Sequence, residues 1–455
     1  MPDYRQFFDP NIGLKAKTAA AAVLANLPLR WGPDGRFWGY RDGVWGDAEG
    51  AMHREITRLL DERYRPSHKQ AIRDVLRGMA EPIGVRATPG VINFRNGMVR
   101  WNDREIARLK HHDMYESTVQ LPVDYIEDAE CAEFDKFLAA AVNPDDITRV
   151  WQLIGYAMMT GNPLQRMFLL TGAGGNGKGV FLHVLTSILG EHNVSHVPLH
   201  GFINDRWAPA QLFNRLANIC GDIDTTYIEQ TGRIKELAGE DTIPGERKHE
   251  NPFDFTFWGK AIFSANGIPA SADATVGWSR RWEVIGFPNA PKRPDRRLKD
   301  RLCTPESLQG IAARAVRALV GLLEAGDFDH GESAARAHLE FRQRSNTVLR
   351  WLEEDMFDDG ATWYDRKLLL KRFRAWAHED SGGGARPMGS QTFYDRLRGV
   401  PTLTEAKRQG VWGFRGMRFR AEIAYGEVID GSTDSDEEMP PATQGQNDPD
   451  PIPGL

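Results

Sequence analysis

Apolar residues recur along the first part of the chain with two different spacings. Over residues 52–64 and 67–79 they recur every three or four positions, which predicts amphipathic helices, the second with Ser67 as its N-cap. Over residues 36–45 and 91–101, large apolar residues instead flank glycine, asparagine and aspartate, which predicts β-hairpins. Helices and hairpins together predict an N-terminal α+β domain, which we place at residues 1–135.

The middle of the chain has a different pattern. A helical stretch over 134–159, broken near Asn143-Pro144, is followed by four short apolar runs, at 167–171, 216–220, 255–264 and 282–287. Runs of this kind are typical of parallel strands buried on both faces, and the helical stretches between them indicate a sheet covered by helices. The predicted fold class is therefore α/β for residues 136–330, ending on an amphipathic helix at 306–326.

The C-terminal part reads as a separate small domain at residues 340–427. Three helical segments precede an aromatic and basic stretch that predicts a hairpin; they lie at 348–355, 366–378, 390–398 and 411–419. Residues 428–455 contain seven acidic residues, no Lys or Arg and little apolar surface to bury. Such a composition predicts a disordered acidic tail.

Composition excludes several classes of protein. Hydrophobic residues make up 41% of the chain and charged residues 26%, as in globular proteins. No run approaches the roughly 18 apolar residues of a membrane helix, and the N-terminus lacks the pattern of a signal peptide. Three widely spaced cysteines, Cys131, Cys220 and Cys303, argue against disulfides and zinc knuckles. We therefore expect a cytoplasmic protein.

The net charge of −6 reflects the tail, because the tail holds seven acidic residues and no basic ones. The rest of the chain is nearly neutral. Nucleic-acid binding must therefore depend on local basic patches.

The most specific motif follows the apolar run at 167–171. It consists of Gly172, Ala173, Gly174, Gly175, Asn176, Gly177, Lys178 and Gly179. This is the GxxxxGK pattern of a phosphate-binding P-loop, placed after a strand and before a helix. The loop's N–H groups would converge on phosphate oxygens, and Lys178 would reach the β- and γ-phosphates. The cofactors expected are ATP and Mg²⁺, although Gly179 replaces the Ser or Thr whose hydroxyl usually binds the metal.

Two acidic residues follow the apolar run at 216–220. A P-loop enzyme needs an acid at the end of a neighbouring strand to hold Mg²⁺ and to polarise water. Asp222 and Asp224 would project in the same direction if the chain is still extended there. We assign Asp222 to the metal and Asp224 to the attacking water, although the two roles could be exchanged. Either residue could instead cap a helix or a turn.

The order of these motifs resembles the superfamily 3 helicases of phage, plasmid and poxvirus primase-helicases. Four further segments are similar to that family's motif after Walker B, its DNA-contacting hairpin, its sensor 1 and its terminal arginine motif: 234–243, 244–251, 263–269 and 278–287. Residues 30–125 look like the helicase-associated domain upstream, and the C-terminal domain resembles the family's winged helix. Each motif alone is weak, but together in this order they are specific.

The resemblance implies a P-loop AAA+-like core that works in a homo-oligomeric ring, a hexamer in the family. Asn266 would contact the γ-phosphate, with a turn-forming role as the alternative. Arg280 or Arg281 would reach the ATP of the neighbouring subunit, because an arginine is always charged and suits transition-state charge. No primase domain precedes the helicase, so a separate primase and other replisome proteins are expected partners.

The expected DNA contacts lie in two places. Arg247, Lys248 and His249 would form a basic hairpin tip that follows the phosphates of single-stranded DNA, or else an ordinary solvated loop. In the C-terminal domain, four arginines of the third helix and the hairpin would contact duplex DNA, or else form a solvated basic surface. They are Arg396, Arg398, Arg415 and Arg418.

Together these features predict an ATP-dependent DNA helicase that translocates on single-stranded DNA during phage or plasmid replication. One alternative is a small-substrate kinase, which would need a lid and would not need the basic C-terminal domain. The other is a nucleotide-regulated origin-binding or loader protein without processive unwinding, which Gly179 keeps open. ATPase activity measured with and without single-stranded DNA separates the three.

Overall fold

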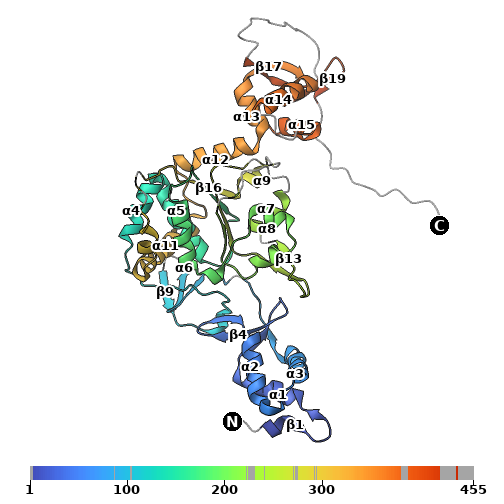
Figure 1. The fold of residues 1–455 in the computed structure, drawn as a ribbon. Helices are drawn as coiled ribbons and strands as arrows, with labels where there is room; N and C mark the ends of the chain where they lie inside the picture. Colours follow the sequence, from blue (N-terminus) through green and yellow to red (C-terminus); the bar gives the residue numbers. More distant parts are fainter. Residues whose placement is uncertain are drawn as a thin grey trace, which may run out of the picture. The chain divides into compact units, whose positions relative to one another are not determined.

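A computed structural model describes residues 4–86, 88–102, 105–221, 223, 231–239, 241–269, 271, 275–291, 293, 295–380, 388–420 and 437–438. The chain divides into two compact units, Met1–Arg342 and Gln343–Leu455, which are taken separately below. Figure 1 shows the elements of each unit. Among the described residues, no helix is both long and apolar enough to cross a membrane.

The first unit begins with helices packed on a small sheet. Strands β3 (Leu29–Trp31), β4 (Phe37–Arg41), β5 (Val44–Asp47) and β6 (Glu81–Pro82) form the sheet in the order β5-β4-β3-β6. The helices are α1 (Ala16–Asn26), α2 (Glu49–Leu60) and α3 (Pro66–Met79). Ile56, Ile72 and Leu76 are fully buried between them, which confirms the helical periodicity seen in the sequence.

A second antiparallel sheet follows, with β7 (Val91–Phe94), β8 (Gly97–Asn102) and β9 (Glu105–Leu109). Its first hairpin lies within the predicted stretch 91–101 and turns at Arg95-Asn96, because Gly97 already pairs with Phe94. The helical stretch after it is divided into α4 (Ala132–Ala141) and α5 (Ile147–Met158), because a short 3₁₀ turn at Pro144–Asp146 separates them. Helix α11 (Pro305–Ala325) packs directly on α5.

The centre of the first unit is a five-stranded parallel sheet in the order β11-β12-β15-β10-β16. The bounds are β10 (Met167–Thr171), β11 (Val194–Ser195), β12 (Ala217–Cys220), β15 (Lys260–Ala265) and β16 (Trp282–Gly286). The predicted α/β sheet is therefore present, with β10 between β15 and β16.

Helices cover both faces of this sheet, as Figure 1 shows. Phe168 and Leu170 of β10 pack in one apolar cluster with α5, α11 and α6 (Lys178–Leu189). Met167 and Leu169 point the other way, into a cluster with α7 (Leu199–Asn204) and α8 (Thr231–Gly239). The alternation along one strand explains why its sequence is apolar at every position but the last.

One predicted strand proved to be two elements. The apolar run at 255–264 is divided between β14 (Phe253–Thr256) and β15 of the central sheet. Strand β14 pairs instead with β13 (Thr242–Gly245) to form an antiparallel hairpin. The division falls at Gly259, where a Cβ would lie 2.5 Å from the Arg215 carbonyl oxygen, so the chain turns where only glycine fits.

The second unit has a mixed order of helices and strands. Its elements are α13 (Thr347–Asp355), β17 (Met356–Asp365), α14 (Arg366–Asp380), α15 (Ser390–Arg398), β18 (Thr404–Arg408) and β19 (Val411–Phe419). Helix α12 (Glu332–Ser345) precedes them, and the sheet order is β17-β19-β18-β20. Trp351, Leu369 and Phe393 are buried in its core.

Two predictions for this unit change. The stretch 411–419 is one strand rather than a hairpin; the hairpin is β18–β19, because Gln409 and Gly410 take φ values of +48° and +81° and form its turn. Of the tail expected at 428–455, the structure describes only β20 (Glu437–Glu438), which pairs with β18. The other residues of the tail lie outside the described part.

Candidate nucleotide and DNA sites

The P-loop lies between the end of β10 and the start of α6, as the motif required. Gly172 takes φ +153°, and a Cβ there would lie 1.9 Å from Asn176 Nδ2 and 2.4 Å from the Phe287 carbonyl oxygen. Gly177 is the N-cap of α6 with φ +95°. The turn therefore needs glycine at both positions and directs the helix's free N–H groups into the loop.

Two polar side chains of the loop are almost fully buried. Asn176 donates from Nδ2 to the Phe287 carbonyl, 2.5 Å away, and so ties the loop to the end of β16. Lys178 donates from Nζ to the Gly172 carbonyl at 2.5 Å and to Asn176 Oδ1 at 3.2 Å. A cation inside a loop of backbone N–H groups at a helix start fits a polyphosphate, because each of these groups attracts negative charge.

The sheet register brings a further predicted residue to the same edge. Thr171 lies beside Ala265 of β15, so Gly172 and Asn266 both follow directly after neighbouring parallel strands. Asn266 is exposed there. The chain after β12 also stays beside β15, since the Ile223 N–H donates to the Ser264 carbonyl at 2.8 Å. Asp222 and Asp224 lie outside the described residues.

Gly179 is the second residue of α6 and faces open space. A Cβ built there meets no heavy atom within 4 Å. The absence of a hydroxyl at this position is therefore not forced by crowding. Residues 172–179 carry no hydroxyl or carboxylate side chain, and the assignment of Mg²⁺ to Asp222 stays a prediction.

The two candidate arginines have different environments. Arg280 is exposed, and no described residue makes a hydrogen bond or ion pair with its side chain. Arg281 is half-buried, and its Nη1 donates to the carbonyl of Gly277 in the preceding turn. Trp278 and Trp282 flank the pair and are buried, with ring centroids 5.4 Å apart. The segment is thus held by its tryptophans and exposes Arg280.

Arg166, the residue directly before β10, binds the backbone of this segment. It donates from Nη1 to the Arg280 carbonyl and from Nη2 to Asp327, and its Nε lies 3.2 Å from Glu283. Glu283 is 3% exposed, and this burial raises the pKa of its carboxyl group, against the opposing effect of Arg166 and Arg149. This cluster of opposite charges holds the backbone of Arg280 in place just before β16.

The hairpin β13–β14 has its tip at residues 246–252, where a DNA-contacting hairpin was predicted. Its first basic residue, Arg247, is engaged: Nη1 lies 3.3 Å from Asp34 and 3.5 Å from Glu250, and the guanidinium lies 4.7 Å from the Phe253 ring centroid. Lys248 and His249 are exposed at the tip.

The same tip is tied to the N-terminal segment by a second ion pair. Glu250 accepts from Nη2 of Arg36 at 2.6 Å. Asp34 and Arg36 lie more than 200 positions from the hairpin in sequence, so the sequence pattern gave no sign of either contact. Arg247 and Glu250 therefore position the tip, while Lys248 and His249 remain available to a ligand.

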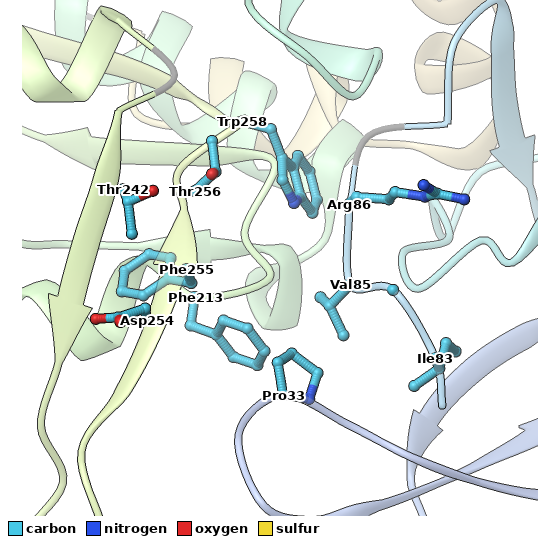
Figure 2. Close-up of a pocket in the computed structure, with 11 residues that line it drawn as sticks. Pro33, Ile83, Val85, Arg86, Phe213, Thr242, Asp254, Phe255, Thr256 and Trp258 are labelled. Atoms are coloured by element: carbon cyan, nitrogen blue, oxygen red, sulfur yellow. The ribbon is translucent and has the colours of Figure 1, made fainter. Parts of the chain in front are cut away.

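A cavity of about 590 Å³ lies where the base of this hairpin meets the N-terminal segment. Figure 2 shows Trp258, Phe213 and Thr256 on one side and Val85 on the other. The guanidinium of Arg86 points away from the cavity. The lining is thus mainly apolar, which fits a joint between two segments better than an anion site.

Comparisons with known proteins agree with this arrangement. Residues 30–143 match the family described as "D5 N terminal like", and residues 170–281 match a family of unknown function, DUF5906. The chain thus carries two regions associated with superfamily 3 helicases. The resemblance seen in the order of short motifs is thereby confirmed. No curated protein matches the chain.

Among solved structures, the chain is similar to two described as the A form apo structure of the NrS-1 C terminal region. One is 12% identical, with a TM-score of 0.48, over 88% of this chain and 98% of the other. The second is 11% identical, with a TM-score of 0.46, over 88% and 99%. Scores in this range leave the family assignment to the two sequence families.

In the C-terminal unit, the four predicted duplex contacts are not equally available. Arg396 is 8% exposed, and its Nη1 lies 3.5 Å from Thr347 Oγ1. Arg398 donates to Glu405 at 2.8 Å, and Arg418 lies 3.7 Å from Asp359. Arg415 is half-buried on β19. The assignment of these arginines to DNA stays a prediction, and the structure shows that most are engaged within the unit.

The basic residues that sequence reasoning missed lie on α14. Lys367, Lys371 and Arg374 are exposed on this helix. Their spacing of four and three residues was a readable signal, because it places side chains on one side of a helix.

Proposed function

We propose that this chain is an ATP-driven helicase motor that translocates on single-stranded DNA and unwinds duplex DNA during phage or plasmid replication. The observation that carries the proposal is the P-loop itself, with Lys178 directed into a loop at the carboxyl edge of a parallel sheet. Ligands of open α/β sheets bind at that edge. The strand order, with β10 between β15 and β16, supports an AAA+-like core.

Each residue of the nucleotide site has a separate task in this proposal. The loop N–H groups and Lys178 hold the phosphates, and ATP with Mg²⁺ supplies the reacting phosphoryl group. Asn266 contacts the γ-phosphate from the neighbouring strand. Asp222 holds the metal and Asp224 orients the attacking water. Catalysis then depends on positioning and on stabilisation of charge, as in other phosphoryl transfers.

The position of Arg280 supports hydrolysis between subunits. Trp282 lies beside Met167, so Arg281 is level with Arg166, six residues before Gly172. At about 3.3 Å per residue, the arginine pair lies roughly 20 Å along the strand direction from its own P-loop. Arg280 is thus too far from its own nucleotide and well placed for that of a neighbour. A ring, hexameric in the family, provides such neighbours.

The hairpin supports a role in DNA tracking that rests on Lys248 and His249. Both are exposed at the tip, whereas Arg247 is held by Asp34 and Glu250. We therefore expect Lys248→Ala to lower DNA stimulation of the ATPase while leaving stability unchanged. Arg247→Ala should instead lower stability, because it leaves Asp34, whose side chain is 3% exposed, without this partner.

The C-terminal unit fits a winged helix. Its order of α13, β17, α14, α15 and the β18–β19 hairpin is that of a helix-turn-helix followed by a wing. A duplex-binding unit attached to the motor suits a helicase that engages double-stranded DNA ahead of unwinding. The partners implied are single-stranded and duplex DNA, further copies of this chain, a separate primase and other replisome proteins.

The test is ATP hydrolysis by the purified full chain with and without single-stranded DNA, paired with strand displacement from a forked duplex. The proposal expects hydrolysis that DNA stimulates and displacement that requires ATP. A protein that binds ATP and DNA but hydrolyses ATP at a rate unaffected by DNA, and displaces no strand, contradicts it.

A nucleotide-regulated origin-binding or loader protein is the second candidate, because Gly179 supplies no hydroxyl to the metal. It predicts assembly that depends on ATP binding, duplex affinity and no strand displacement. The same pair of assays therefore decides between the two.

A further inference from the structure

Helix α14 presents three basic side chains away from the core of the C-terminal unit. Lys367, Lys371 and Arg374 are exposed and spaced by four and three residues, so they lie along one side of the helix. Leu369 and Phe373, on the other side, are buried in the core. We refer to the three basic residues as the α14 stripe.

Most other basic side chains of this unit have partners inside it. Seven arginines each contact a carboxylate, a hydroxyl, a carbonyl or an aromatic ring: Arg350, Arg366, Arg372, Arg396, Arg398, Arg418 and Arg420. In residues 346–380 and 388–420, by contrast, no hydrogen bond, ion pair or ring contact involves a side chain of the α14 stripe. The stripe is positive charge that the described fold itself does not use.

Helix α15, which was expected to contact DNA, offers much less uncompensated positive charge than the α14 stripe. On α15, Arg398 pairs with Asp395 and with Glu405, so its charge is already compensated. Arg396 is buried at 8% exposure. The exposed side of α15 is therefore nearly neutral, and it has little attraction for a polyanion.

We propose that the α14 stripe docks on the phosphate backbone of duplex DNA. The inference rests on the proposed function for the identity of the partner, and it transfers the main contact from α15 to α14. Seven residues separate Lys367 from Arg374, which is about 10.5 Å along a helix axis. That span is close to the rise of three phosphates on one strand, at about 3.4 Å each.

The surroundings favour a duplex over a single strand. Proteins that hold single strands stack bases on exposed aromatic rings, and the α14 stripe contains none. Trp376, the nearest tryptophan on the helix, is instead held by a hydrogen bond to Glu354 at 2.9 Å and by Arg350 over its ring. A straight row of cations without aromatic neighbours suits a regular backbone of phosphates.

The wing, which is the β18–β19 hairpin, lies beside the start of the α14 stripe. Arg366, next to Lys367, lies 5.4 Å from the centroid of the Trp412 ring, and Lys407 lies 6.0 Å from the same ring. The β18–β19 hairpin is therefore beside the first turn of α14. A duplex lying along the α14 stripe would continue towards Lys407. The helix and the wing would then form one binding surface.

The test measures binding of the nucleotide-free full chain to a 20-base-pair duplex over a range of salt concentrations. Each lost phosphate contact lowers the slope of log Kobs against log salt by about 0.9. Lys371→Gln with Arg374→Gln should therefore lower the slope by roughly two units and weaken binding at least tenfold at low salt. The charge-keeping pair Lys371→Arg with Arg374→Lys should retain both.

Two controls isolate position from net charge. Lys17→Gln with Arg65→Gln removes the same charge from exposed sites of the first unit and should change neither value. Arg398→Gln tests α15 directly and should have a much smaller effect than the α14 pair. As a second readout, the duplex should protect Lys367 and Lys371 from chemical acetylation.

Three results would overturn the inference, and they are distinguishable. If the wild-type chain binds no duplex, the DNA part of the proposed function fails as well. If it binds duplex and Arg398→Gln weakens binding more than the α14 pair, only the transfer to α14 is wrong. If residues 428–455 rather than DNA protect the two lysines, the occupant of the stripe is the acidic tail.

Discussion

Replacing Arg280 with alanine tests whether this chain hydrolyses ATP between subunits. The side chain is exposed and has no partner among the described residues, so its removal should change the free energy of unfolding by less than about 0.5 kcal/mol. An arginine supplied to a neighbour's nucleotide is worth about 10³–10⁵ in rate. We therefore expect Arg280→Ala to bind ATP normally and to lose hydrolysis by at least about 10³-fold.

Arg281 is the internal comparison. Its guanidinium donates to the Gly277 carbonyl and is half-buried, so it holds its own turn. Arg281→Ala should lower the free energy of unfolding by about 1–2 kcal/mol. Its effect on hydrolysis should be smaller than that of Arg280→Ala. Thermal melts and ATPase rates of both variants, measured side by side, separate the two roles.

Mixing two inactive proteins then asks whether the arginine acts on a neighbour. In a ring assembled at random from equal amounts of Lys178→Ala and Arg280→Ala, half of the P-loops and half of the arginines are intact. About a quarter of the interfaces then pair an intact P-loop with an intact arginine, so about a quarter of the wild-type ATPase rate should return. Unwinding needs coordination around the ring and should recover less.

Action of Arg280 on a neighbour is contradicted if the mixture stays inactive although the two proteins demonstrably assemble together. It is also contradicted if Arg280→Ala alone keeps its ATPase activity, since the residue would then be an ordinary surface charge. Co-assembly is checked by pulling down one tagged variant with the other. The distance of roughly 20 Å between this arginine and its own P-loop, at about 3.3 Å per strand residue, makes action within one subunit the least consistent outcome.

Three further perturbations follow from the same geometry. Lys178→Ala removes the cation of the P-loop and should lower the ATPase rate by at least about 10²-fold while leaving duplex binding intact; near-normal hydrolysis would show that the phosphates bind elsewhere. Gly179→Ser has room for its side chain, because a Cβ there meets nothing within 4 Å. It should lower the Mg²⁺ concentration needed for half-maximal activity, and an unchanged or higher value would mean that another ligand already serves the metal. Gly155→Ala would place a Cβ 2.2 Å from the Ala315 carbonyl oxygen and 2.8 Å from Leu319 Cβ, so it should cost about 1–3 kcal/mol in the free energy of unfolding. Gly321→Ala on α11, where a Cβ meets nothing within 4 Å, is its matched control and should stabilise by up to about 1 kcal/mol, as a melting experiment would show.

The sequence by itself determined the features that depend on neighbours along the chain. The P-loop could be identified from the sequence because its function needs glycines and a lysine at fixed positions. These positions lie within eight residues, between a strand and a helix. The helices of the N-terminal and C-terminal segments were readable from apolar spacing, because each buries one side against a core. The family followed from the order of motifs, which is also a property of the chain alone.

Only the tertiary structure decided which charged side chains are available. Arg247 and Arg280 look alike in sequence, as basic residues in short loops, but Arg247 meets Asp34, 213 positions away, and Arg280 stays exposed. In the same way, Arg396 is buried while Lys371 is free to face solvent. The physical reason is that attraction between charges depends on distance and burial, and both are set by segments that are remote in sequence.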